Sequence, residues 1–221
     1  MDIDLLPWAR RLIPAAIAIA VLVWAARDLP GYKLRGDREA QNVLILSTAV
    51  LMGIRWFNVD AFEGVHLHFI WACIAALMFG ARFALCAMAL VSLVAWAMHS
   101  AWHGPFSDFL ATSAIPVGVV SMVAWAVARW LPANIFIYVL CTAFASGALS
   151  IASSNLFKAA MNAWFFMDEP SWPYLIATPP MMFGEGFFCG GAMVLIVVYR
   201  PQWCASFDDD RYLAPPTDDK K

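Results

Sequence analysis

Charged residues are scarce in this sequence. Only 14% of its 221 residues are Asp, Glu, Lys or Arg, whereas 62% are hydrophobic. Charged residues normally make up about a quarter of a soluble chain, so a soluble domain of this size would have too little charge to cover its surface. The scarcity excludes an ordinary soluble protein and predicts an integral membrane protein.

Several functional motifs are also missing. The formal net charge is −2 and Lys and Arg form no cluster that would neutralise phosphates, which excludes a nucleic-acid partner. The chain has no nucleophile elbow, Walker A loop, Rossmann fingerprint or HExxH, so we expect neither an enzyme nor a nucleotide site. Its five cysteines form no CxxC pair, which predicts buried thiols rather than disulfides or a zinc knuckle.

Long apolar runs are what the sequence has in abundance. A hydrocarbon core of about 30 Å needs roughly 20 apolar residues per helix. Seven spans are predicted on this basis: Leu12 to Ala26, Val43 to Phe57, two within His68 to Met98 separated at Gly80-Ala81-Arg82, Phe109 to Trp130, Ile135 to Phe157, and Met181 to Tyr199. Pro116 predicts a kink in the fifth. We therefore expect an all-α membrane domain over residues 1–200 and a disordered, acidic cytoplasmic tail over 201–221.

The ends of the chain and its basic residues predict how it sits in the membrane. Asp2, Asp4 and Pro7 replace the basic start of a cleavable signal, so we expect the first span to be retained. Basic loops remain cytoplasmic. With the N-terminus outside, ten of the 14 Lys and Arg residues lie inside, which predicts an N-out, C-in, multi-pass protein of a bacterial inner membrane. The four on the outer side are Arg10, Arg11, Arg55 and Lys158. Arg10 and Arg11 oppose this pattern.

The chain's histidines all fall on the predicted outer side, near acidic residues. The set comprises His66, His68, His99 and His103, with Asp60, Glu63 and Asp108 nearby. Imidazole and carboxylate are the usual ligands of divalent first-row metals. His99 and His103 would share a face of a helix, and His66 and His68 would share a face only in extended chain. Each histidine alone could simply face water, but together they predict a metal or cation site.

Glu185 lies inside the last predicted span. An ionisable side chain at that depth costs about 2.5 to 3.5 kcal/mol on insertion scales, so it usually faces the bundle interior or a partner. Two interpretations stay open: a functional carboxylate, or a structural one that is hydrogen-bonded between helices.

Three segments resemble one known family. The stretch from His68 to Gly80 is similar to that family's His-Leu-Leu-Gly-Gly-x-Leu-Ala-Ala-x-Leu-Leu-Gly, with histidine and final glycine in register. Gly184-Glu185-Gly186, followed by Arg200-Pro201, resembles its last helix. Met52 to Asn58 is similar to a segment with Asn-Phe-Pro. The family is the CbiM/NikM type of substrate-capturing membrane subunit in energy-coupling-factor ABC transporters for cobalt and nickel.

The resemblance implies a helical bundle like that of the substrate-binding (S) components of these transporters, capture of cobalt or nickel on the outer face, and a membrane scaffold and ATPases on other chains. His68 matches the family's downstream ligand. The family's N-terminal Met-His-Ile is replaced by Met1-Asp2-Ile3, so its planar nitrogen site cannot form in the same way. We expect His68 to be the primary ligand of nickel or cobalt, ahead of zinc or copper. The other expected ligands are His66, His99, His103, Asp60, Glu63 and Asp2.

Two other functions remain open at this stage. The missing Met-His start and the aromatic content suggest a non-transporting membrane component of a redox or metalloenzyme-assembly complex. A membrane enzyme that uses Glu185 and the histidines on a lipid substrate has only the residue types in its favour.

Overall fold

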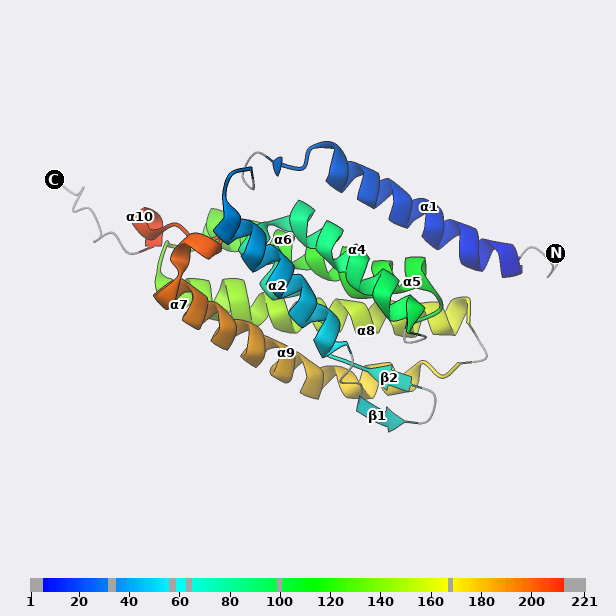
Figure 1. Ribbon diagram of the computed structural model, residues 1–221. Helices are drawn as coiled ribbons and strands as arrows, with labels where there is room; N and C mark the ends of the chain where they lie inside the picture. The colour runs from blue at the N-terminus through cyan, green and yellow to red at the C-terminus, as the bar shows by residue number, and fades with distance from the viewer. Residues whose placement is uncertain are drawn as a thin grey trace.

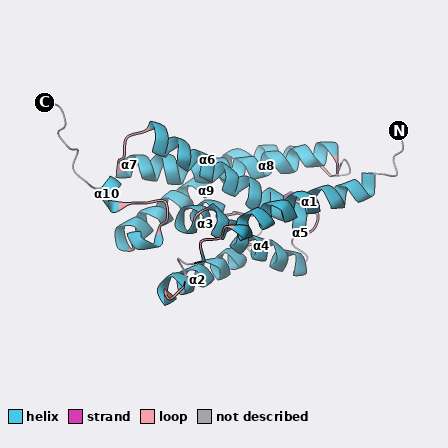
Figure 2. Ribbon diagram, turned by 90° about the horizontal axis from the view of Figure 1, so that it is seen from above, coloured by secondary structure: helices cyan, strands magenta, loops and turns pink. Residues whose placement is uncertain are grey.

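The described part of the chain forms an elongated helical bundle with one small β hairpin (Figure 1). The computed structural model describes residues 6–31, 35–55, 59–62, 65–98, 101–166 and 169–212. The chain begins near the end of the bundle that carries the hairpin, and its C-terminal segment lies at the opposite end (Figures 1 and 2). These are called the hairpin end and the tail end below.

Each predicted apolar segment contains a helix or a helical rod, although the helix in the third segment has eight residues and is too short for a helical crossing. The single helices are α1 (Leu6–Arg27), α2 (Arg38–Ile54), α3 (Ala72–Phe79), α4 (Ala81–Ala97) and α9 (Trp172–Tyr199). One rod joins α5 (Pro105–Phe109), the π-helical turn η3 (Leu110–Ala114) and α6 (Ile115–Trp130). The other joins α7 (Ile135–Ile137), the π-helical η4 (Tyr138–Ala145) and α8 (Ser146–Trp164). Within the described residues, the two rods and α9 are long and apolar enough to cross a bilayer.

The outer surface of the bundle is apolar, as a membrane protein requires. Trp130, Phe136 and Trp164 are 72%, 74% and 77% exposed. Water would solvate such large side chains poorly, whereas lipid chains solvate them well, and Trp is common at membrane interfaces. The chain is a multi-pass membrane protein, as its composition predicts.

The regular secondary structure of the described residues is helical, as predicted, apart from one short hairpin that the sequence does not predict. Strand β1 (Val59–Phe62) pairs antiparallel with β2 (Val65–Leu67), with Phe62 opposite Val65. The hairpin follows α2 directly, so the second span ends before Phe57, where the sequence placed its end. It leads the chain back toward α3 and brings the segment with His68 to the bundle.

The sequence predicts a kink at Pro116, and the structure has an irregular turn just before it. Pro116 is the second residue of α6, and the irregular turn is η3, which directly precedes α6. A π-helical turn accommodates an extra residue and leaves a backbone carbonyl free, so the proline is tolerated without breaking the rod.

The expectation of a disordered tail from residue 201 is also wrong for its first part. The segment from η5 (Pro201–Trp203) to α10 (Asp209–Tyr212) packs on the bundle, and Cys204 and Phe207 are buried. Ala205 N donates to Met78 O at 2.8 Å and Ser206 N donates to Leu77 O at 3.1 Å. The tail segment therefore donates hydrogen bonds to backbone carbonyls in the last turn of α3, which lack a donor within the helix.

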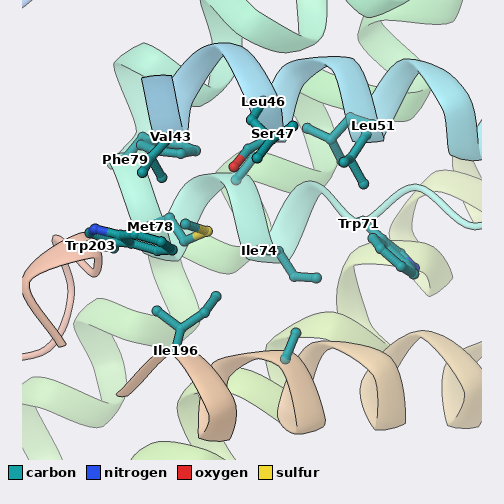
Figure 3. A pocket seen from close by; sticks show the side chains of 13 residues that line it. Val43, Leu46, Ser47, Leu51, Trp71, Ile74, Met78, Phe79, Ile196 and Trp203 are labelled. Atoms are coloured by element: carbon teal, nitrogen blue, oxygen red, sulfur yellow. The ribbon is translucent and has the colours of Figure 1, made fainter. Parts of the chain in front are cut away.

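A groove runs along the outside of the bundle between α2 and α9, with α3 as its floor (Figure 3). Its volume is about 280 Å³, and Ile74 and Met78 of α3 and Ile196 of α9 line it. Trp71 and Trp203 mark its two ends. Helix α3, which forms the floor, is only eight residues long, and α2 contacts α4.

Glycines let α9 approach its neighbours closely. A Cβ atom on Gly186 would lie 2.9 Å from the backbone oxygen of Phe144, and one on Gly184 would lie 2.8 Å from the Phe69 ring. Small residues at helix contacts are the usual way in which membrane helices pack tightly.

Gly186→Ala should destabilise the protein by about 1 to 3 kcal/mol, because the backbone oxygen of Phe144 cannot move aside as a side chain would. Gly191→Ala is the matched control on the same helix, since nothing lies within 4 Å of its added Cβ. The thermal unfolding midpoint in detergent measures both. Equal midpoints for the two variants would contradict the close contact.

Candidate functional site

Glu185 connects α9 to the chain segment that leads into α3. Its side chain is fully buried, and its two oxygens accept hydrogen bonds from Ile70 N at 3.1 Å and Trp71 N at 2.5 Å. These N–H groups precede the first helical turn and have no partner within α3. A carboxylate at a helix start is also favoured by the helix dipole. Of the two interpretations left open by the sequence, the structure therefore favours the hydrogen-bonded structural carboxylate.

His68 lies on the segment that Glu185 holds. It follows β2 directly, two residues before Ile70, and is only 6% exposed. The hairpin fixes the chain before it, and the two hydrogen bonds to Glu185 fix the chain after it. His68 is therefore a buried imidazole on a short non-helical segment with restrained ends.

His103 has other partners. The helix that was expected to carry His99 and His103 on one face, α4, ends at Ala97, and His99 lies outside the described residues. The His103 ring stacks on Phe166 at a centroid distance of 3.6 Å, and Nε2 lies 3.2 Å from Oε2 of Glu169. Burial lowers the pKa of His103, while Glu169 acts in the opposite direction. The ring therefore joins the loop before α5 to the loop before α9.

Of the other predicted ligands, two belong to the hairpin strands and three lie outside the described residues. Asp60 and His66 belong to the neighbouring strands β1 and β2. Glu63, His99 and Asp2 lie outside the described residues. Within the residues that the structure describes, no three His, Cys, Asp or Glu side chains come together as a metal site would require. The fold thus brings the backbone of Asp60, His66 and His68 to the hairpin end.

A group of buried charges was missed by the sequence analysis. Arg55, just after α2, donates to Asp108 Oδ1 at 2.6 Å and to Thr112 Oγ1 at 3.1 Å. Asp108 also accepts from the backbone N of Trp102 at 3.2 Å. Asp108 is fully buried, so it is an ion-pair partner inside the bundle rather than an acid on the outer surface.

Lys158 adds a second buried cation. It is 3% exposed, and its Nζ lies 5.8 Å from the centre of the Tyr174 ring. Arg55 and Lys158 were predicted to lie on the outer side, whereas both are buried within the bundle. The sequence of α8 contains a signal for this buried polar face, because every fourth residue along it is polar. The residues are Ser146, Ser150, Ser154, Lys158 and Asn162.

Asp108→Asn should destabilise the protein by about 3 to 5 kcal/mol, because Arg55 would remain buried without its negative partner. The control is Asp28→Asn, which removes the exposed ion pair with Arg82 and should cost no more than about 1 kcal/mol. Thermal or denaturant unfolding in detergent measures both variants. A loss for Asp108→Asn as small as that for Asp28→Asn would contradict the claim that Arg55 is buried and needs Asp108 as its partner.

Comparisons with known proteins agree with this architecture. The family model described as "Cobalt uptake substrate-specific transmembrane region" (CbiM) matches residues 4–203. A solved transition metal transporter has a TM-score of 0.67 and 17% identity, covering 86% of this chain and 88% of that one. A truncated transition metal transporter has a TM-score of 0.64 and 17% identity, covering 87% and 94%. At this identity the two structures establish a shared fold. No curated protein matches the sequence.

Proposed function

The chain belongs to the CbiM family of cobalt uptake substrate-specific transmembrane regions, and on that premise we propose that it captures a divalent transition metal ion at its hairpin end for uptake. Nickel or cobalt is the expected cargo, ahead of zinc or copper, because the matching family model is one of cobalt uptake. Imidazole nitrogen and carboxylate oxygen are suitable ligands for such divalent ions. The observation that carries the proposal is the position of His68, a buried imidazole on a restrained segment in a chain of this family.

His68 is the primary ligand in this proposal. Asp60 and His66 on the hairpin are the nearest candidates along the chain to complete the site, with Glu63, His99 and Asp2 as further donors. His103 is left out of the ligand set, because Nε2 already faces Glu169 and the ring stacks on Phe166. Because the second residue is Asp2, an oxygen ligand would replace the imidazole that the family has there.

The proposed orientation is N-out and C-in in a bacterial inner membrane. The hairpin end would then face outward and receive the ion, and the tail end would face the cytoplasm. Transport requires an energy source, and this sequence has no nucleotide-binding motif. The partners are therefore a membrane scaffold and ATPase subunits on other chains, as in energy-coupling-factor transporters.

Titration of purified protein with Ni²⁺ and Co²⁺ by calorimetry tests the site. His68→Ala should abolish binding or weaken it by at least about a hundredfold, because it removes a direct ligand. His103→Ala is the matched control and should leave the affinity within a few-fold of the wild type. Unchanged affinity in His68→Ala would remove the site assignment, and equal losses in both variants would return His103 to the ligand set.

The alternative function is a non-transporting component of a redox or metalloenzyme-assembly complex. It is favoured by one observation, the aspartate at position 2 in place of the histidine of the resembled family. Uptake of radioactive nickel or cobalt by cells that co-express the scaffold and ATPases separates the two, since only a transporter increases uptake. Adjacent scaffold and ATPase genes would favour transport, and adjacent oxidase or hydrogenase genes would favour assembly.

Catalysis on a lipid is not proposed. Both carboxylate oxygens of Glu185 accept backbone hydrogen bonds inside the bundle, which is the arrangement of a structural group.

A further inference from the structure

An apolar cavity separates the first half of α1 from the end of α8. Its volume is about 350 Å³, and every residue that lines it is apolar except Arg10. Ile13 and Ile17 form the α1 side, while Phe157 and Phe166 lie on the side of α8. Ile13 and Ile17 are 50% and 49% exposed, so the cavity opens on the surface that faces lipid.

The dimensions and lining of the cavity favour an acyl chain as its occupant. A transmembrane helix with its side chains is about 10 to 12 Å wide, which is too wide for a space of this volume. Water is equally unsuited, because apolar cavities without polar partners remain dry. A lipid chain is narrow and apolar, and the surrounding bilayer supplies it at high concentration.

Arg10 supplies the polar end of the site. Its guanidinium carbon lies 5.7 Å from the centre of the Phe166 ring, at the edge of the cavity. Its Nε atom is buried, and among the described residues no acceptor lies within hydrogen-bonding distance of it. Guanidinium groups bind phosphate through two parallel hydrogen bonds, so this donor suits a phosphate oxygen.

Arg10 and Arg11 differ in burial and in whether they line the cavity. Both oppose the distribution of basic residues that predicts the orientation of the chain, so their presence near the start of α1 needs a reason. Arg11 is exposed and does not line the cavity, whereas Arg10 does. The cation, the apolar cavity and the lipid-facing opening lie together at the hairpin end.

We propose that an anionic phospholipid binds here, with one acyl chain in the cavity between α1 and α8 and its phosphate on Arg10. The bound lipid ties the start of α1 to the end of α8. None of the residues that line the cavity is a proposed metal ligand, and the proposal does not depend on the proposed function.

The test uses full-length protein, stripped of lipid in detergent, with phosphatidylglycerol or phosphatidylcholine added back. Native mass spectrometry counts the bound lipids, and the unfolding midpoint reports stabilisation. Wild-type protein should retain one phosphatidylglycerol molecule in preference to phosphatidylcholine, with a higher midpoint. Arg10→Gln should weaken this binding by about tenfold or more, the loss expected for charged hydrogen bonds. Arg11→Gln should bind as the wild type does.

A second pair of variants tests the cavity. Ile17→Trp fills it and should prevent retention of the lipid, whereas Ile19→Trp, at an exposed position that does not line the cavity, should not. Equal losses in Arg10→Gln and Arg11→Gln would indicate general attraction to the charged helix start and would overturn the proposal. Equal retention of both lipids would also overturn it. So would a photo-crosslinker at residue 17 that captures a second copy of the chain instead of lipid.

Discussion

The carboxylate of Glu185 and the two backbone N–H groups of Ile70 and Trp71 form the contact on which the rest of the site depends. In a bilayer an unsatisfied backbone group costs several kcal/mol, so an irregular segment persists only where protein groups satisfy it. Glu185 does so at the start of α3, and Ala205 and Ser206 do so at its end. These contacts allow α3 to be short, and a short α3 leaves room for the non-helical segment that carries His68.

The remaining packing keeps that contact in place. Gly184 and Gly186, on either side of Glu185, allow α9 to lie against Phe69 and Phe144. At the same end of the bundle, the buried ion pair of Arg55 and Asp108 joins the end of α2 to α5. A buried pair is costly to desolvate and adds little net stability, but removal of one partner leaves a buried charge alone. Its role is therefore to fix how the helices meet beneath the hairpin.

The sequence predicted the features that depend on composition and on single intramembrane residues. The seven apolar segments became helices or rods, because a chain in lipid must satisfy its backbone within each segment. Glu185 was recognised because a carboxylate inside an apolar span must have partners, although the sequence could not identify them. The hairpin was not predicted, because two strands of four and three residues give too little periodicity to detect.

Partners distant in sequence explain the other differences. Arg55 and Lys158 were assigned to the outer side because, with the N-terminus outside, each lies at the outer end of a predicted span. Only the fold shows that Arg55 meets Asp108, 53 residues later. The tail was expected to be disordered because it is acidic, but Cys204 and Phe207 are buried against the bundle. Such contacts depend on tertiary structure, which composition does not report.

Titration of Glu185 variants with nickel or cobalt tests whether Glu185 positions the metal ligand His68. Glu185 does not touch the ion in this account, so its effect must come through the position of His68. The affinity for the ion should be lower in Glu185→Gln, which keeps one acceptor oxygen, than in the wild type. It should be lower still in Glu185→Ala, which keeps none. Each affinity is measured at a temperature where circular dichroism shows all three proteins to be folded. Equal affinity in the three folded proteins would contradict the claim that Glu185 positions the metal ligand.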